Sequence, residues 1–179
     1  LQLPELQPIT VDEVGGRLAL IYDRSNLGES NSYWLEPSGD GVVWIGDRWY
    51  RGKVLLMPTE NGVKAINYVN IDDYLYSVVG SEMPTSWPQE ALRSQAVAAR
   101  SYALYHQRHA RSRAYDLSST QISQVYKGLQ GEASSTHTAV NATRGKVLTH
   151  GGQVIEAVFH SSSGGHTENS EHVWSKAVP

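Results

Sequence analysis

The chain of 179 residues is 40% hydrophobic and 18% charged, a composition typical of a globular protein rather than a disordered one. Its net charge of -3 argues against a nucleic-acid binder, whose surface would be basic. The absence of cysteine excludes disulfides and thiol chemistry, and no apolar run reaches the length of a membrane span.

Residues 1–70 are predicted to be rich in β-structure. About five short apolar runs lie between residues 10 and 71, among them the alternating RLALIYD and the run NGVKAINYVNI, which opens on an Asn-Gly turn signal. Short strands separated by turn residues predict a small barrel or sandwich. Tyr and Trp are frequent, with ten and five copies against one Phe, which suits sugar binding but equally suits a half-buried core.

Residues 71–179 are predicted to be α+β. A short helix is expected to open at Asp72 and end at Gly80. A long helix is expected from Pro88, because apolar residues and alanines then recur at steps of three and four as far as His106. We also expect, within residues 71–179, a further helix that ends at Gly145 and a hairpin that turns at Gly151-Gly152. The expected fold class is therefore α+β, with an N-terminal β-rich part packed on an α+β part and a join near residues 70–80.

Glu82 is a carboxylate on a Met-Pro turn that directly precedes the long predicted helix. A carboxylic acid that donates a proton near neutral pH is helped by burial among apolar groups. The neighbours able to supply such walls are Val79, Met83, Pro84 and Trp87. The alternative is an ordinary acid on the surface beside a helix.

The stretch FHSSSGGHTENSEHVW, residues 159–174, collects hydroxyls, glycines, histidines and two glutamates. It lacks the Gly-x-Ser-x-Gly pattern of a serine nucleophile, and its histidine spacing matches no zinc site. Two interpretations stay open: a polar loop that hydrogen-bonds a hydroxyl-rich ligand, and a glycine-rich surface turn.

The sequence resembles the stage II sporulation protein D (SpoIID) family, which includes the amidase enhancer LytB. The resemblance is carried by three motifs in the family's order, and it extends over roughly residues 60–174. The motifs are INYVNIDDYLYSVVGSEMPTSWPQEALRSQAVAARSYAL, SQVY and FHSSSGGHTENSEHVW. We therefore expect a single SpoIID-like domain over residues 1–179.

The resemblance implies a peptidoglycan lytic transglycosylase. Such an enzyme cuts the bond between N-acetylmuramic acid (MurNAc) and N-acetylglucosamine (GlcNAc) in glycan strands stripped of stem peptides, and leaves 1,6-anhydro-MurNAc ends. The family's catalytic acid falls on Glu82, which would act first as acid and then as base. The implied substrate-binding residues are Arg100, Tyr102, Gln124, Tyr126, His160, Ser161, Ser162, Ser163, Gly164, Gly165, His166 and Glu168. Glu168 is also the rival acid of a scheme with two carboxylates.

The alternative function is a non-catalytic, glycan-binding enhancer of a cell-wall amidase. The expected partners are therefore peptidoglycan glycan strands and a cell-wall amidase, without nucleic acid. The expected location is extracytoplasmic, in the periplasm or cell wall, with membrane anchoring through a segment outside these residues.

The sequence departs from the family at two points. Some members hold zinc through Cys, His and Cys, where this chain has Ser118, Ile122 and Ser123. We therefore expect no metal and no cofactor. The sequence also stops at Pro179, whereas family members continue, so a C-terminal segment that completes the groove wall is expected to be missing.

Overall fold

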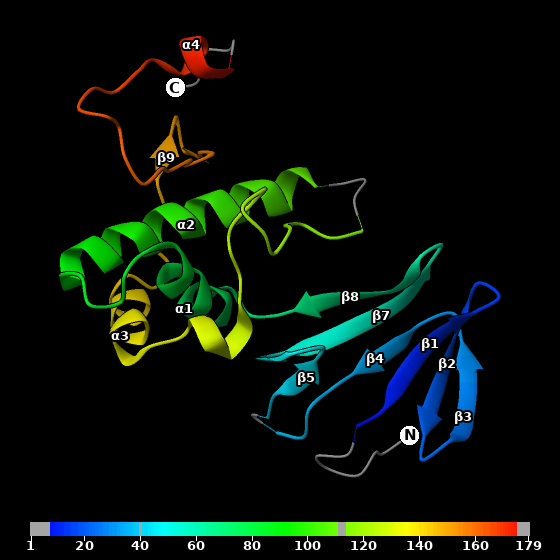
Figure 1. The fold of residues 1–179 in the computed structure, drawn as a ribbon. Helices are drawn as coiled ribbons and strands as arrows, with labels where there is room; N and C mark the ends of the chain where they lie inside the picture. The colour runs from blue at the N-terminus through cyan, green and yellow to red at the C-terminus, as the bar shows by residue number, and fades with distance from the viewer. Residues whose placement is uncertain (1–7, 40, 111–113, 175–179) are drawn as a thin grey trace. The chain divides into compact units, whose positions relative to one another are not determined.

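The computed structural model describes residues 8–39, 41–110 and 114–174 (Figure 1). The fold has two compact units. The first holds residues up to Tyr74 together with Gly128–Gln130, and the second holds residues 75–127 and 131 onward. The expected extent of a single SpoIID-like domain stays a prediction, and its ends at residues 1–7 and 175–179 lie outside the described residues. Among the described residues, no helix combines the length and the apolar character that crossing a bilayer requires.

The first unit is built of antiparallel strands. One sheet has the order β1-β2-β3, with β1 Thr10–Val14, β2 Arg17–Tyr22 and β3 Ser25–Ser30. A second has the order β4-β7-β8, with β4 Tyr33–Leu35, β7 Lys53–Thr59 and β8 Gly62–Tyr68. A hairpin pairs β5 Val43–Ile45 with β6 Arg48–Tyr50. The described residues form eight strands where about five were expected, because β1 and β3 contain few apolar residues and were not recognised as strands.

These strands share one apolar core. Leu18 on β2 packs with Val54 and Leu56 on β7, and partly buried side chains surround them, namely Val11, Tyr33, Leu35, Val43 and Ile45. The core contains residues from separate sheets, so the sheets pack against each other. Within the described residues, no closed barrel forms. With the helices of the second unit, this confirms the predicted α+β class.

The second unit contains the predicted long helix and hairpin. Its elements are α1 Ile71–Glu82, which begins in the first unit, α2 Gln89–His109, α3 Ser134–Ala142, β9 Thr149–His150, β10 Gln153–Val154 and α4 Ser170–Trp174. The 3-10 turn η1 Gly128–Gly131 belongs to the first unit except for Gly131. β9 and β10 pair antiparallel across the predicted Gly151-Gly152 turn. α3 ends at Ala142 rather than at Gly145.

Alanines give α2 a slim face that packs against α3. Leu92, Ala96, Ala99 and Ala103 are buried on α2, and Ala139 and Val140 are buried on α3. Small side chains let the two helices approach closely, because little volume stands between their backbones. This packing fixes the part of α2 that carries the candidate site.

The sequence suggested that the first helix ends at Gly80, but α1 continues to Glu82. A glycine is required there for another reason. A Cβ at Gly80 would overlap the carbonyl oxygen of Gly131 and lie 3.1 Å from Cγ2 of Thr85. Gly80 therefore lets the backbone of Gly131 lie directly against α1.

We expect Gly80→Ala to destabilise the fold, because overpacking usually costs about 1–3 kcal/mol. The roughly 1 kcal/mol by which alanine favours a helix over glycine offsets part of this cost, so the net loss should be up to about 2 kcal/mol. Ser81→Ala is the matched control, because the Ser81 hydroxyl is buried without a hydrogen-bond partner among the described residues. Chemical denaturation of both variants tests this, and equal stability of the two would show that Gly131 yields without cost.

Candidate active site

Glu82 is the last residue of α1, not the head of the long helix as the sequence suggested. Its half-buried carboxylate accepts a hydrogen bond at Oε1 from the backbone N–H of Val125, at 2.6 Å. Among the described residues Oε1 is the oxygen with such a partner, which leaves Oε2 open to a ligand. The hydrogen bond also ties the loop before Val125 to the end of α1.

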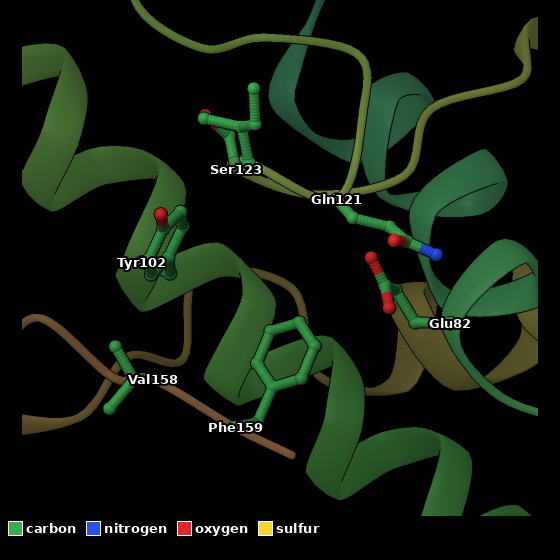
Figure 2. A pocket seen from close by; sticks show the side chains of 7 residues that line it. Glu82, Tyr102, Gln121, Ser123, Val158 and Phe159 are labelled. Atoms are coloured by element: carbon green, nitrogen blue, oxygen red, sulfur yellow. The ribbon is translucent and has the colours of Figure 1, made fainter. Parts of the chain in front are cut away.

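A pocket of about 260 Å³ lies at Glu82 (Figure 2). Its walls come from the end of α1, the middle of α2, the loop before Val125 and the segment after β10. The lining residues are Glu82, Tyr102, Gln121, Ile122, Ser123, Val158 and Phe159. Four segments that are distant in sequence therefore meet at one carboxylate.

The pocket is lined by both polar and apolar groups. Glu82, Gln121 and Ser123 supply the polar groups, and Figure 2 shows the Gln121 amide extending toward the Glu82 carboxylate. The apolar groups are Ile122, Val158 and Phe159, rather than the sequence neighbours expected, which were Val79, Met83, Pro84 and Trp87. Tyr102 offers both a ring and a hydroxyl. Such a pocket suits a ligand with a C–H face and hydroxyl edges, as a sugar ring has.

Hydroxyl groups hold the pocket loop in shape. Oγ of Ser118 lies 2.9 Å from Oγ1 of Thr120, and Oγ of Ser123 accepts the N–H of Ser118 at 3.2 Å. The N–H of Ser123 donates to the carbonyl of Thr120 at 3.0 Å. Within the described residues, no three His, Asp or Glu side chains gather as a metal site would need. The absence of a metal stays a prediction.

Three of the expected sugar contacts lie in the core instead of on the pocket wall. Gln124 and Tyr126 are buried, and Nε2 of Gln124 donates to the carbonyl of Ala99 at 3.4 Å. Arg100 is 1% exposed and donates to the carbonyls of Thr143 at 2.9 Å, Lys146 at 3.2 Å and Val140 at 3.3 Å. Their contact with sugar gains no support from this geometry, whereas Tyr102 does line the pocket.

The predicted sugar loop is exposed in this structure. His160, Ser161, Ser162, Ser163, Gly164, Gly165, His166 and Glu168 are all solvent-accessible and absent from the pocket lining. The lining stops at Phe159, the residue before the loop. Sugar contacts by this loop therefore stay a prediction.

Glu168 is poorly suited to be the proton donor. Its Oε1 lies 2.7 Å from Nδ1 of His172 and accepts the N–H of Asn169 at 2.8 Å. The hydrogen bond with His172, and then that from Asn169, hold the pKa of Glu168 below its usual range. The group is therefore ionised at neutral pH and lacks the proton that a general acid must give.

The sequence did not single out Gln121, Val158 or Phe159 as pocket residues. In the sequence, Ile122 and Ser123 stand out only as replacements for metal ligands. Two signals were present: Gln121 lies within the same loop, and Phe159 is the one phenylalanine of the chain. Neither signal specifies a pocket, because the meeting of this loop with the segment after β10 depends on tertiary packing.

The fold thus has a strand-rich first unit and an α+β second unit that carries a pocket at a carboxylate. The SpoIID family model, described as Stage II sporulation protein, matches residues 59–150. This match covers more than half of the chain, and the chain belongs to the SpoIID family. It includes Glu82, Tyr102 and the pocket loop, and it ends before Val158 and Phe159.

Curated relatives extend the match. An uncharacterized protein of Brachyspira hyodysenteriae is 38% identical over 141 residues, which are 78% of this chain and 38% of that protein. The amidase enhancer of Bacillus subtilis is 43% identical over 105 residues, 59% of this chain and 14% of that protein. Stage II sporulation protein D of Bacillus subtilis is 33% identical over 131 residues, 65% of this chain and 38% of that protein. The chain thus spans well under half the length of these relatives.

Proposed function

We propose that the protein is a lytic transglycosylase that cleaves the MurNAc–GlcNAc bond of peptide-stripped glycan strands and leaves 1,6-anhydro-MurNAc ends. The observation that carries the proposal is the position of Glu82. It is the one carboxylate among the described residues that line the pocket, and it falls in the Ser-Glu-Met-Pro motif where the family resemblance puts the catalytic acid. Family membership by itself supports a role at the cell wall.

One carboxylate is sufficient for this reaction. Protonated Glu82 gives its proton to the glycosidic oxygen, and the bond from that oxygen to the anomeric carbon breaks. The resulting carboxylate takes the proton of the substrate's own 6-hydroxyl, whose oxygen bonds to the anomeric carbon. No water enters, so no second carboxylate is needed to activate one. The Val125 N–H at Oε1 stabilises the anionic state between the two proton transfers.

The size of the pocket suits one sugar ring of a longer polymer. Its volume of about 260 Å³ lies just below the roughly 300–1,000 Å³ of pockets that enclose a whole small ligand. We infer that one ring enters with its C–H face toward Phe159 and Tyr102. Gln121 and Ser123 are then placed to hydrogen-bond its polar edge, and the flanking sugars lie outside the pocket.

The products should carry anhydro ends and take no oxygen from water. An intramolecular hydroxyl is favoured over water because it is already held beside the reacting carbon. Mass spectrometry after incubation with peptide-free glycan strands in ¹⁸O-labelled water tests this. We expect new ends that are lighter by one water than hydrolytic ends and that carry no label. Labelled reducing ends would identify a hydrolase and direct attention back to Glu168 as a second carboxylate.

A second candidate function is supported by the similarity to the amidase enhancer. In this proposal the protein binds glycan without cutting it and stimulates a cell-wall amidase. The same incubation separates the two functions, since an enhancer would leave the strands intact and accelerate a partner amidase. Either function places the protein outside the cytoplasm, where peptidoglycan is found.

A further inference from the structure

Two of the three apolar residues that line the pocket come from a segment without regular secondary structure. Residues 155–160 follow β10 and form neither helix nor strand, yet they supply Val158 and Phe159. The backbone N–H of Ile155 donates to the carbonyl of Leu148 at 3.2 Å, and Ala157 is buried. These contacts hold the start of the segment but do not reach Phe159.

A close contact between Glu156 and His106 joins this segment to α2. Oε1 of Glu156 lies 3.0 Å from Nε2 of His106. Nε2 of His106 is buried and has no hydrogen-bond partner among the described residues. The two side chains are therefore close together without forming a hydrogen bond. The contact is an ion pair when the imidazole of His106 is protonated.

His106 also contacts a pocket residue. Its ring lies 4.3 Å from the ring of Tyr102, centroid to centroid, one helical turn earlier on α2. One side chain thus contacts Tyr102 in one wall and, through Glu156, the segment that forms another wall. Neither His106 nor Glu156 lines the pocket itself.

We propose that His106 and Glu156 are a positioning pair, which sets where Phe159 lies relative to Glu82 and Tyr102 and thereby governs binding of the sugar ring. The identity of the ligand rests on the proposed function, whereas the placement of the wall does not. The side chains of His106 and Glu156 are 22% and 41% exposed. Pairs this accessible contribute little to global stability, so the effect is expected in binding rather than in folding.

The test compares Glu156→Gln, His106→Gln and the double variant. Each single variant should weaken binding of peptide-free glycan about two- to fivefold, the range expected of an accessible ion pair. The double variant should bind no more weakly than the singles, because the interaction is lost only once. Calorimetry in a Glu82→Gln background measures binding without cleavage. In the active protein, KM should rise while kcat changes little.

Hydrogen exchange of the free protein gives a second measurement that needs no ligand. Amides of residues 157–159 should exchange faster in Glu156→Gln, with an unchanged melting temperature. Glu60→Gln is the matched control, because it removes the same charge from the exposed turn between β7 and β8. Unchanged exchange and unchanged affinity would overturn the positioning role and leave the proposed function intact. Faster exchange in a protein that neither binds nor cuts glycan would support the positioning role while refuting the proposed function.

Discussion

Glu82→Gln should reduce glycan cleavage by at least about 100-fold, the scale on which a positioned general acid contributes. Glutamine keeps the size of the side chain, and its carbonyl oxygen still accepts the Val125 N–H. It cannot donate a proton to the glycosidic oxygen or take one from the 6-hydroxyl. The loss should therefore appear in kcat, with glycan affinity largely retained.

Glu168→Gln is the matched control for this substitution. Glu168 is exposed, and its hydrogen bonds with His172 and Asn169 favour the ionised form. Its replacement should change the rate far less than Glu82→Gln does. Initial rates of anhydro-end formation, measured for both variants beside the native protein, decide the assignment. A severe loss in Glu168→Gln with an active Glu82→Gln would transfer the role of acid to Glu168.

The sequence predicted those parts of the fold that depend on local patterns. The long helix α2 follows from apolar residues at steps of three and four, and the β9–β10 hairpin follows from Gly151-Gly152. The prediction that the first helix ends at Gly80 was wrong, because a glycine in a helical pattern indicates either a helix end or a close backbone contact. Its contact with Gly131 involves residues far apart in the chain, and no local pattern encodes it.

The same limit applies to the site: residues in a local motif could be predicted, and residues whose direction depends on the folded loop could not. Glu82 was found through a dense motif, and Tyr102 lies in the same stretch of sequence. Gln124 was predicted to bind sugar, whereas Gln121 from the same loop lines the pocket. In an irregular loop the direction of each side chain depends on the hydrogen bonds of that loop, here those among Ser118, Thr120 and Ser123, and such bonds have no periodicity that can be recognised in a sequence.

Arg100→Met should lower the free energy of unfolding by at least about 2 kcal/mol, because it removes three hydrogen bonds worth about 0.5–1.5 kcal/mol each or more. Arg100 is buried, and its guanidinium donates to the carbonyls of Val140, Thr143 and Lys146. Carbonyls at the end of a helix lack partners within the helix, and α3 ends at Ala142. A cation there also complements the negative end of the helix dipole. Methionine fills part of the space but removes these three hydrogen bonds, although the carbonyls of Val140 and Thr143 keep the backbone N–H groups of Thr143 and Lys146 as donors, at 3.1 and 3.0 Å.

Arg93→Met is the matched control on the same helix. Arg93 forms a partly exposed ion pair with Glu90, so its loss should cost less than about 1 kcal/mol. Urea denaturation of both variants, with glycan binding measured where the protein is folded, separates two roles for Arg100. A structural role predicts that binding falls only as the folded fraction falls. If Arg100→Met were as stable as the native protein and yet failed to bind glycan, Arg100 would be a sugar contact, as the family resemblance implied.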